Sequence, residues 1–150
     1  MKQLVIVGIL ITALSFQSQA QNETLSSRNW ETLAQVDYEK SEDEYGELFV
    51  PVFGKDIRAM EGKEITLPGY IIPFEGMFKP DHIIISSLPV AACFFCGSGG
   101  PESVAEVYLK EPIKYTANAI QVTGKLKLND TDFNQLMYIL EDARMEGPAN

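Results

Sequence analysis

Short runs of apolar residues, separated by Gly, Pro, Asn and Asp, follow one another along most of the chain. Within these runs β-branched and aromatic residues are frequent and apolar positions often alternate with polar ones, as is typical of β-strands. Gly69 interrupts one run at its centre, where a glycine would let the strand bend sharply or form a bulge. Five strands are therefore predicted, at residues 48–53, 64–74, 82–88, 104–109 and 119–128.

A short helical segment is predicted within residues 25–38, ahead of the strands. Ser26 or Ser27 can serve as its N-cap, because a serine oxygen accepts a hydrogen bond from a backbone N–H of the first turn. The apolar face of this helix would hold Trp30, Leu33 and Ala34.

A second helix is predicted after the last strand. Asn129 or Asp130 can cap its start, and Gly147-Pro148 would end it. Its apolar residues fall at i, i+3, i+4 and i+7, which is the spacing of one helix face. These residues are Phe133, Leu136, Met137 and Leu140.

The order of these elements predicts a mainly β (α+β) domain. Five short strands, one of them with a central glycine, favour a small OB-like five-stranded Greek-key barrel with an N-terminal helical turn and a C-terminal helix. Residues 21–47 would form the helical segment and an acidic loop, and residues 48–150 would form the barrel with its C-terminal helix. The acidic loop is expected at residues 39–47, which carry five acidic side chains and few apolar ones.

Residues 1–20 have the features of a cleaved signal peptide. Lys2 supplies a positive charge, residues 4–16 are uncharged and apolar, and the small residues Ser18 and Ala20 precede the expected cut. The apolar stretch is shorter than the about 20 residues that a membrane-spanning helix needs. We therefore expect a protein exported to the periplasm or the extracellular space, and not an integral membrane protein.

The composition narrows the range of partners. The chain has 21 acidic and 12 basic residues and a formal charge of −9. Nucleic acids and anionic membranes are bound by clustered Lys and Arg side chains, so neither is an expected partner. The sequence also lacks the residue patterns of a serine hydrolase or a phosphate-binding loop, which favours a protein that is not an enzyme.

The candidate chemistry lies in Cys93-Phe94-Phe95-Cys96, which contains both cysteines of the chain and is followed by Gly97-Ser98-Gly99-Gly100-Pro101. A structural disulfide is one interpretation, because exported proteins meet an oxidising environment. A bridge across so short a loop would stabilise the fold by only about 2 kcal/mol. A thiol–disulfide redox centre is another interpretation, although the glycines after Cys96 do not predict the helix that usually follows a redox C-x-x-C.

Metal binding is the third interpretation. Two thiolates separated by two residues can hold one soft ion, as in half of a zinc site or in a Cu(I) site. Zinc takes four ligands, and His82 and Glu102 are the candidates to join Cys93 and Cys96. Three further donors could contribute, namely Asp81, Glu106 and Met77.

Three segments together resemble DUF3299, a family of small exported bacterial proteins. The first is Trp-x-x-Leu at residues 30–33, the second is the Gly-Lys to Pro-Gly to Pro segment at residues 62–73, and the third is the cysteine-containing loop and strand at residues 92–107. The likeness spans roughly residues 30–128. It implies an OB-like barrel and a link to metal handling in the cell envelope, in the periplasm of a Gram-negative cell.

The chain departs from this family in its cysteine loop. Phe95 stands where the family has histidine, and Cys96 is added. A Cys/His pair thereby becomes a Cys/Cys pair, which keeps the soft character of the ligands. The resulting prediction is an exported, non-enzymatic protein that binds zinc or copper for metal handling. The alternatives are a periplasmic redox protein and a module that binds an envelope protein, with Tyr70, Phe74 and Phe78 near its surface and the cysteines in a structural disulfide.

Overall fold

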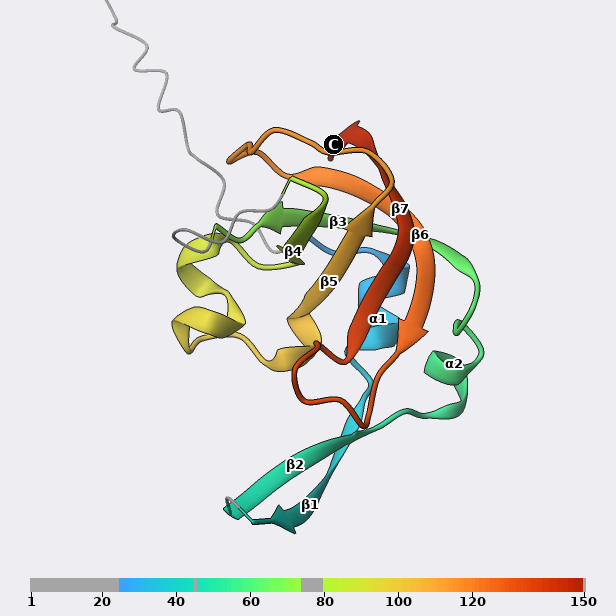
Figure 1. Ribbon diagram of the computed structural model, residues 1–150, viewed down its shortest axis with the longest axis vertical. Helices are drawn as coiled ribbons and strands as arrows, with labels where there is room; N and C mark the ends of the chain where they lie inside the picture. The colour runs from blue at the N-terminus through green and yellow to red at the C-terminus, as the bar shows by residue number, and fades with distance from the viewer. Residues whose placement is uncertain (1–24, 45, 74–79, 150) are drawn as a thin grey trace, which may run out of the picture.

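A computed structural model describes residues 25–44, 46–73 and 80–149 of the protein (Figure 1). The predicted signal peptide at residues 1–20 lies outside the described residues. Among the residues that are described, no helix is long and apolar enough to cross a membrane.

Five strands form a closed barrel, in the order β3-β4-β5-β7-β6 (Figure 1). The parallel neighbours are β5 and β7, and all other neighbouring pairs are antiparallel. The expected mainly β class and the closed five-stranded barrel are confirmed, and this strand order is compatible with an OB-like barrel. The strands are β3 (Glu64–Ile71), β4 (His82–Ser86), β5 (Val104–Leu109), β6 (Ile120–Leu128) and β7 (Tyr138–Pro148).

Four of the predicted strands correspond to β3, β4, β5 and β6. The remaining one, predicted at residues 48–53, lies outside the barrel in a separate hairpin of β1 (Asp37–Asp43) and β2 (Gly46–Val52). This hairpin projects from one end of the barrel (Figure 1). Residues 39–43 of the acidic segment expected as a loop therefore belong to β1, because they pair with residues 46–50 of β2, which include the β-forming Phe49 and Val50.

The prediction of a C-terminal helix is wrong. Residues 130–137 form turns and bends, and residues 138–148 form β7, the longest strand of the barrel. Tyr138, Ile139 and Leu140 are all fully buried, between β5 and β6. Phe133, which the helical pattern placed on the apolar face, is 67% exposed. Pairing with β5 and β6 outweighs the local helical spacing, since it satisfies the backbone of β7 on both sides.

The predicted N-terminal helix is present as α1 (Arg28–Leu33), capped by Ser27, whose hydroxyl accepts a hydrogen bond from the Trp30 N–H at 3.2 Å. Trp30 and Leu33 are buried as predicted. Ala34 was predicted on the same apolar face, but it is exposed. The indole N–H of Trp30 donates to the carbonyl of Pro68 at 2.7 Å, which attaches α1 to β3. A second, single-turn helix, α2 (Lys55–Arg58), joins the hairpin to the barrel and buries Ile57.

Two glycines allow close approach of barrel strands. At Gly69, where a bend was expected, β3 changes its partner from β6 to β4, and a Cβ atom there would lie 2.8 Å from Cβ of Ile85. Gly124 of β6 faces a bulge in β7 at which Asp142 has a positive φ of 52°. A Cβ atom on Gly124 would lie 2.8 Å from Cβ of Ala143. Such bends and bulges increase the strand curvature that barrel closure requires.

Replacement of Tyr138 by phenylalanine should destabilise the protein. The Tyr138 hydroxyl donates to the carbonyl of Leu33 at 2.6 Å inside the core and so ties β7 to α1. Tyr138→Phe removes the shorter of two hydrogen bonds to that carbonyl, which keeps the Val36 N–H at 3.4 Å. We therefore expect the free energy of unfolding to fall by about 0.5–1.5 kcal/mol in denaturant titrations. Tyr138→Leu, which also removes ring volume, should cost more. Equal stability of Tyr138→Phe and the parent protein would contradict this role.

Candidate functional site

The two cysteines lie in a compact loop between β4 and β5. Three single-turn 3₁₀ helices make up this loop: η1 (Val90–Ala92), η2 (Phe94–Cys96) and η3 (Pro101–Ser103). Its ends are held together by a hydrogen bond from the Ser87 N–H to the Ser103 carbonyl at 2.9 Å. Gly97 has a φ of 82°, a conformation that favours glycine, and it lets the chain reverse directly after Cys96.

The turn η2 brings the two sulfur atoms together. The Cys96 N–H donates to the Cys93 carbonyl at 3.0 Å, and the two Sγ atoms lie 3.5 Å apart as free thiols. Cys93 is fully buried, and Cys96 is exposed. The Cys96 thiol also donates to the Val90 carbonyl, with a sulfur to oxygen distance of 3.0 Å. The pair therefore presents one sulfur to solvent and keeps the other inside the loop.

The protonation of Cys96 depends on Cys93. The hydrogen bond between the thiols, together with desolvation and the charge of a Cys93 thiolate, holds the pKa of Cys96 above its ordinary value. Reactive cysteines of redox centres have a lowered pKa, which a following helix or a nearby cation provides. In this loop the residues after Cys96 begin with a left-handed glycine, so the chain turns away instead of continuing as a helix.

His82 lies at the opposite end of β4 from the cysteine loop. Ser86 pairs with Val104 near the loop, whereas His82 pairs with Tyr108 four residues further along β5. Four residues of strand span about 13 Å. The His82 ring stacks on Tyr108, with ring centroids 4.3 Å apart, and its Nε2 lies 2.6 Å from Oε1 of Glu106. The structure thus pairs His82 with Glu106 and does not bring it to the sulfur atoms.

Glu102, the fourth predicted ligand, is engaged elsewhere as well. Its carboxylate accepts a hydrogen bond from the Tyr38 hydroxyl at 3.0 Å, which connects the cysteine loop to the hairpin. Within residues 25–44, 46–73 and 80–149, no three His, Cys, Asp or Glu side chains gather closely enough to hold a metal ion. Of the predicted donors, Cys93 and Cys96 are together and His82 and Glu102 are apart from them. Met77, Phe74 and Phe78 lie outside the described residues.

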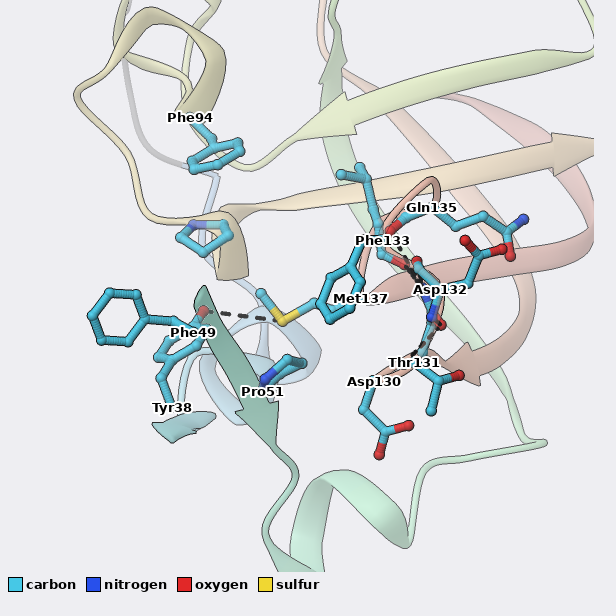
Figure 2. Close-up of a pocket in the computed structure, with 13 residues that line it drawn as sticks. Tyr38, Phe49, Pro51, Phe94, Asp130, Thr131, Asp132, Phe133, Gln135 and Met137 are labelled. Atoms are coloured by element: carbon cyan, nitrogen blue, oxygen red, sulfur yellow. Dashed lines mark hydrogen bonds between the residues drawn. The ribbon is translucent and has the colours of Figure 1, made fainter. Parts of the chain in front are cut away.

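An open cleft of about 210 Å³ lies beside the cysteine loop. Its walls come from the hairpin, from the cysteine loop and from the connection between β6 and β7 (Figure 2). Figure 2 shows Tyr38 and Phe49 on one side and Phe133 on the other, with Met137 between them. This cleft was not predicted from the sequence. Its residues are distant in sequence, and the one local signal was Phe133, an apolar residue that we assigned to a helix.

Asn129 shapes the wall formed by the β6–β7 connection. Its side-chain oxygen accepts from the Asp132 N–H at 3.0 Å, and its amide group donates to the carbonyls of Asp132, Gln135 and Leu136 at 2.7, 3.2 and 3.3 Å. The oxygen thus acts as the predicted N-cap would, but the amide folds the following residues into a closed loop. The Leu136 N–H then donates to Glu106, which fastens this loop to β5.

Replacement of Asn129 by alanine should loosen this loop. Asn129 is buried, so its loss leaves several backbone groups without partners, and we expect unfolding to become easier by about 1–3 kcal/mol. The loop amides should also exchange faster with deuterated solvent, because their hydrogen bonds open locally. Asn118→Ala, at an exposed asparagine outside the loop, is the control and should stay within about 0.5 kcal/mol of the parent. If hydrogen exchange of the loop amides is unchanged in Asn129→Ala, this residue does not organise the loop.

The Cys96 thiol should titrate above the ordinary range for a cysteine, as followed by the ultraviolet absorbance of its thiolate. Because the folded state favours the neutral thiol, its stabilising effect is present below the pKa of the unfolded chain and is lost as the pH rises through the folded-state pKa. Cys93→Ala removes the first cause of the shift and should bring the pKa of Cys96 back toward its ordinary value. A pKa below the ordinary value would instead favour a redox centre.

Comparison of the chain with protein-family models, with curated protein sequences and with solved structures found no match. The resemblance to DUF3299 therefore stays a prediction.

Proposed function

We propose that this protein is exported to the periplasm or the extracellular space, is not an enzyme, and holds a soft metal ion between Cys93 and Cys96. The observation that carries the proposal is the unbonded sulfur pair, 3.5 Å apart on one turn. Two thiolates bound to tetrahedral zinc at about 2.3 Å each lie about 3.8 Å apart. A small side-chain rotation would therefore convert the thiol pair into a pair of metal ligands.

Three features of the loop support this use. Cys93 is held inside the loop, Cys96 is open to an incoming ion, and the left-handed Gly97 turns the chain away directly after Cys96. Metal binding would release protons from both thiols, so affinity should increase with pH. The raised pKa of Cys96 makes this competition with protons stronger than at an ordinary thiol.

The available ligands favour transient binding of a metal ion, as needed for transfer, over permanent binding of a structural ion. Two sulfurs satisfy Cu(I), whereas Zn(II) takes two more ligands. His82 is already paired with Glu106, and Glu102 with Tyr38, so either residue would have to leave its partner to reach the ion. We propose that Cu(I) is held by the two thiolates, or that a zinc ion shares its remaining positions with a partner protein in the envelope. The barrel that supports the loop is of the OB type in this proposal.

The redox alternative uses the same two residues and differs in its chemistry. In this alternative, Cys93 and Cys96 would form a disulfide, and an envelope oxidant would take up the two electrons and two protons that they lose. Its attacking thiolate would need to form readily near neutral pH, and the raised pKa of Cys96 opposes that. The metal proposal does not need an easily ionised free thiol, because the ion itself displaces the protons.

The test is metal binding by the processed protein, purified without oxygen and titrated with Cu(I) or Zn(II) in competition with a chelator of known affinity. We expect one ion per chain, and an affinity at least about 100-fold lower in Cys93→Ser and in Cys96→Ser, since loss of a ligand should exceed the cost of losing an outer-shell partner.

Two variants serve as controls. Ser98→Ala changes an exposed side chain of the same loop and should bind the ion as the parent does. His82→Ala should also retain Cu(I), because the ion is held by sulfur alone, and a loss there would return His82 to the ligand set. Binding that persists in both cysteine variants would refute the proposal.

A further inference from the structure

The cleft beside the cysteine loop has the properties of a docking site. Its two most exposed aromatic side chains are Phe49 of β2 and Phe133 of the β6–β7 connection, which are 65% and 67% exposed. Met137 lies between them, and its sulfur is 4.0 Å from the Tyr38 hydroxyl, whose shorter contact is the hydrogen bond to Glu102 (Figure 2). Exposed apolar side chains that gather around one hollow, unlike scattered ones, mark an interaction surface.

The hairpin that forms one wall also points to a partner. A two-stranded hairpin is marginally stable by itself, and β1 and β2 form a sheet of their own outside the barrel. Tyr38 attaches the base of this hairpin to the cysteine loop through Glu102, while Phe49 further along β2 remains exposed. A segment that packs against Phe49 would bury the apolar side chain that the hairpin leaves in solvent.

The negative charge around the cleft indicates a positively charged partner. The described residues that line it include Asp130 and Asp132 and no lysine or arginine, and Arg58 approaches Asp130 only to 3.9 Å. Hydrogen bonds from the backbone and side chain of Asn134 hold the pKa of Asp132 below its ordinary value, so this carboxylate is charged at neutral pH. The hairpin adds exposed acids, of which Glu47 is paired with Lys40. The strand pairing places Glu42 and Lys40 on the hairpin face that carries Tyr38 and Phe49, whereas Asp37 and Glu39 lie on the opposite face.

We propose that the cleft docks an extended basic segment of a partner protein. A bulky apolar side chain of this segment enters the hollow between Phe49 and Phe133, and its lysines or arginines meet the carboxylates of the hairpin and the β6–β7 connection. The volume of about 210 Å³ is below the about 300–1,000 Å³ of common small-molecule sites, and it suits a side-chain anchor. A second copy of this chain would bring acid against acid, which its charge of −9 opposes.

This docking does not depend on the proposed metal function. Phe94, which lies between the two cysteines, lines the same cleft, so a docked segment would lie next to the metal loop. A partner bound there would be well placed to exchange an ion with Cys96. The cleft residues themselves are aromatic, aliphatic and acidic, and binding of a basic segment uses none of the sulfur atoms of the cysteine pair.

The probe is a labelled octapeptide with lysine at alternate positions and phenylalanine or leucine between them, measured by fluorescence anisotropy with the processed protein. We expect it to bind at least about 10-fold more tightly than the same peptide with glutamate for lysine or with serine for the apolar residues. Higher salt should weaken binding, because the charge pairs are exposed. Phe49→Ser and Phe133→Ser should each reduce the affinity about 10-fold or more.

The controls separate this inference from the metal proposal. Met145→Ser changes an exposed apolar residue of the barrel away from the cleft and should bind the peptide normally. Phe49→Ser should keep the metal stoichiometry of the parent, and Cys96→Ser should keep the peptide affinity. The inference fails if the lysine peptide does not bind, if the glutamate peptide binds equally well, or if the Phe variants are unchanged. It also fails if sedimentation shows a dimer that Phe49→Ser dissociates, since the occupant is then a second copy.

Discussion

The parallel pairing of β5 with β7 is the contact on which the rest of the structure depends. β7 enters the barrel between β5 and β6 and pairs with both, so the sheet closes only when β7 is in place. Without it, β5 and β6 would each present an open edge, and open edges invite pairing with other chains. Tyr138, at the start of β7, extends this closure to α1 through its hydrogen bond with Leu33.

The same pairing decides which loops are neighbours. Because β5 and β7 are adjacent and parallel, both begin at one end of the barrel, and the segments that lead into them emerge side by side. These segments are the cysteine loop and the β6–β7 connection. Phe94 and Met137 therefore line one cleft although they are far apart in sequence. The barrel thus places a sulfur pair and an apolar, acidic cleft at the same end.

The two proposed activities use different physical properties of that end. Metal binding depends on local geometry, since one turn of backbone sets the separation of the two sulfur atoms. Docking depends on surface that elements from three parts of the chain assemble together. Their proximity would be useful to a protein that passes an ion to a partner, because docking would bring the partner's ligands close to Cys96 and raise their effective concentration there.

The sequence by itself determined the features whose causes lie within a few residues. Ser27 caps α1 through an N–H three residues away, and Cys93 and Cys96 meet because one turn spans them. The strands β3, β4, β5 and β6 were also predictable, since their alternating or β-branched residues indicate the side that faces the core. Gly69 predicted a bend or a bulge, and it lies at the point at which β3 changes its partner strand.

Only the tertiary structure decided the remaining features. Residues 130–140 carry helical spacing, and Asn129 supplies a cap, yet residues 130–137 form a loop and pairing with β5 and β6 makes residues 138–140 the start of β7. The acidic residues of β1 predict a loop when the sequence is considered locally, and their pairing with β2 makes them a strand. His82 was a predicted metal ligand with Cys93 and Cys96, and the register of β4 with β5 pairs it with Glu106 and Tyr108 instead. For β7 and His82, the determining contacts depend on how the strands of the barrel pair, which no local pattern of residues indicates. The β1–β2 hairpin lies outside the barrel, and there the pairing of two adjoining segments outweighs the polar composition of β1.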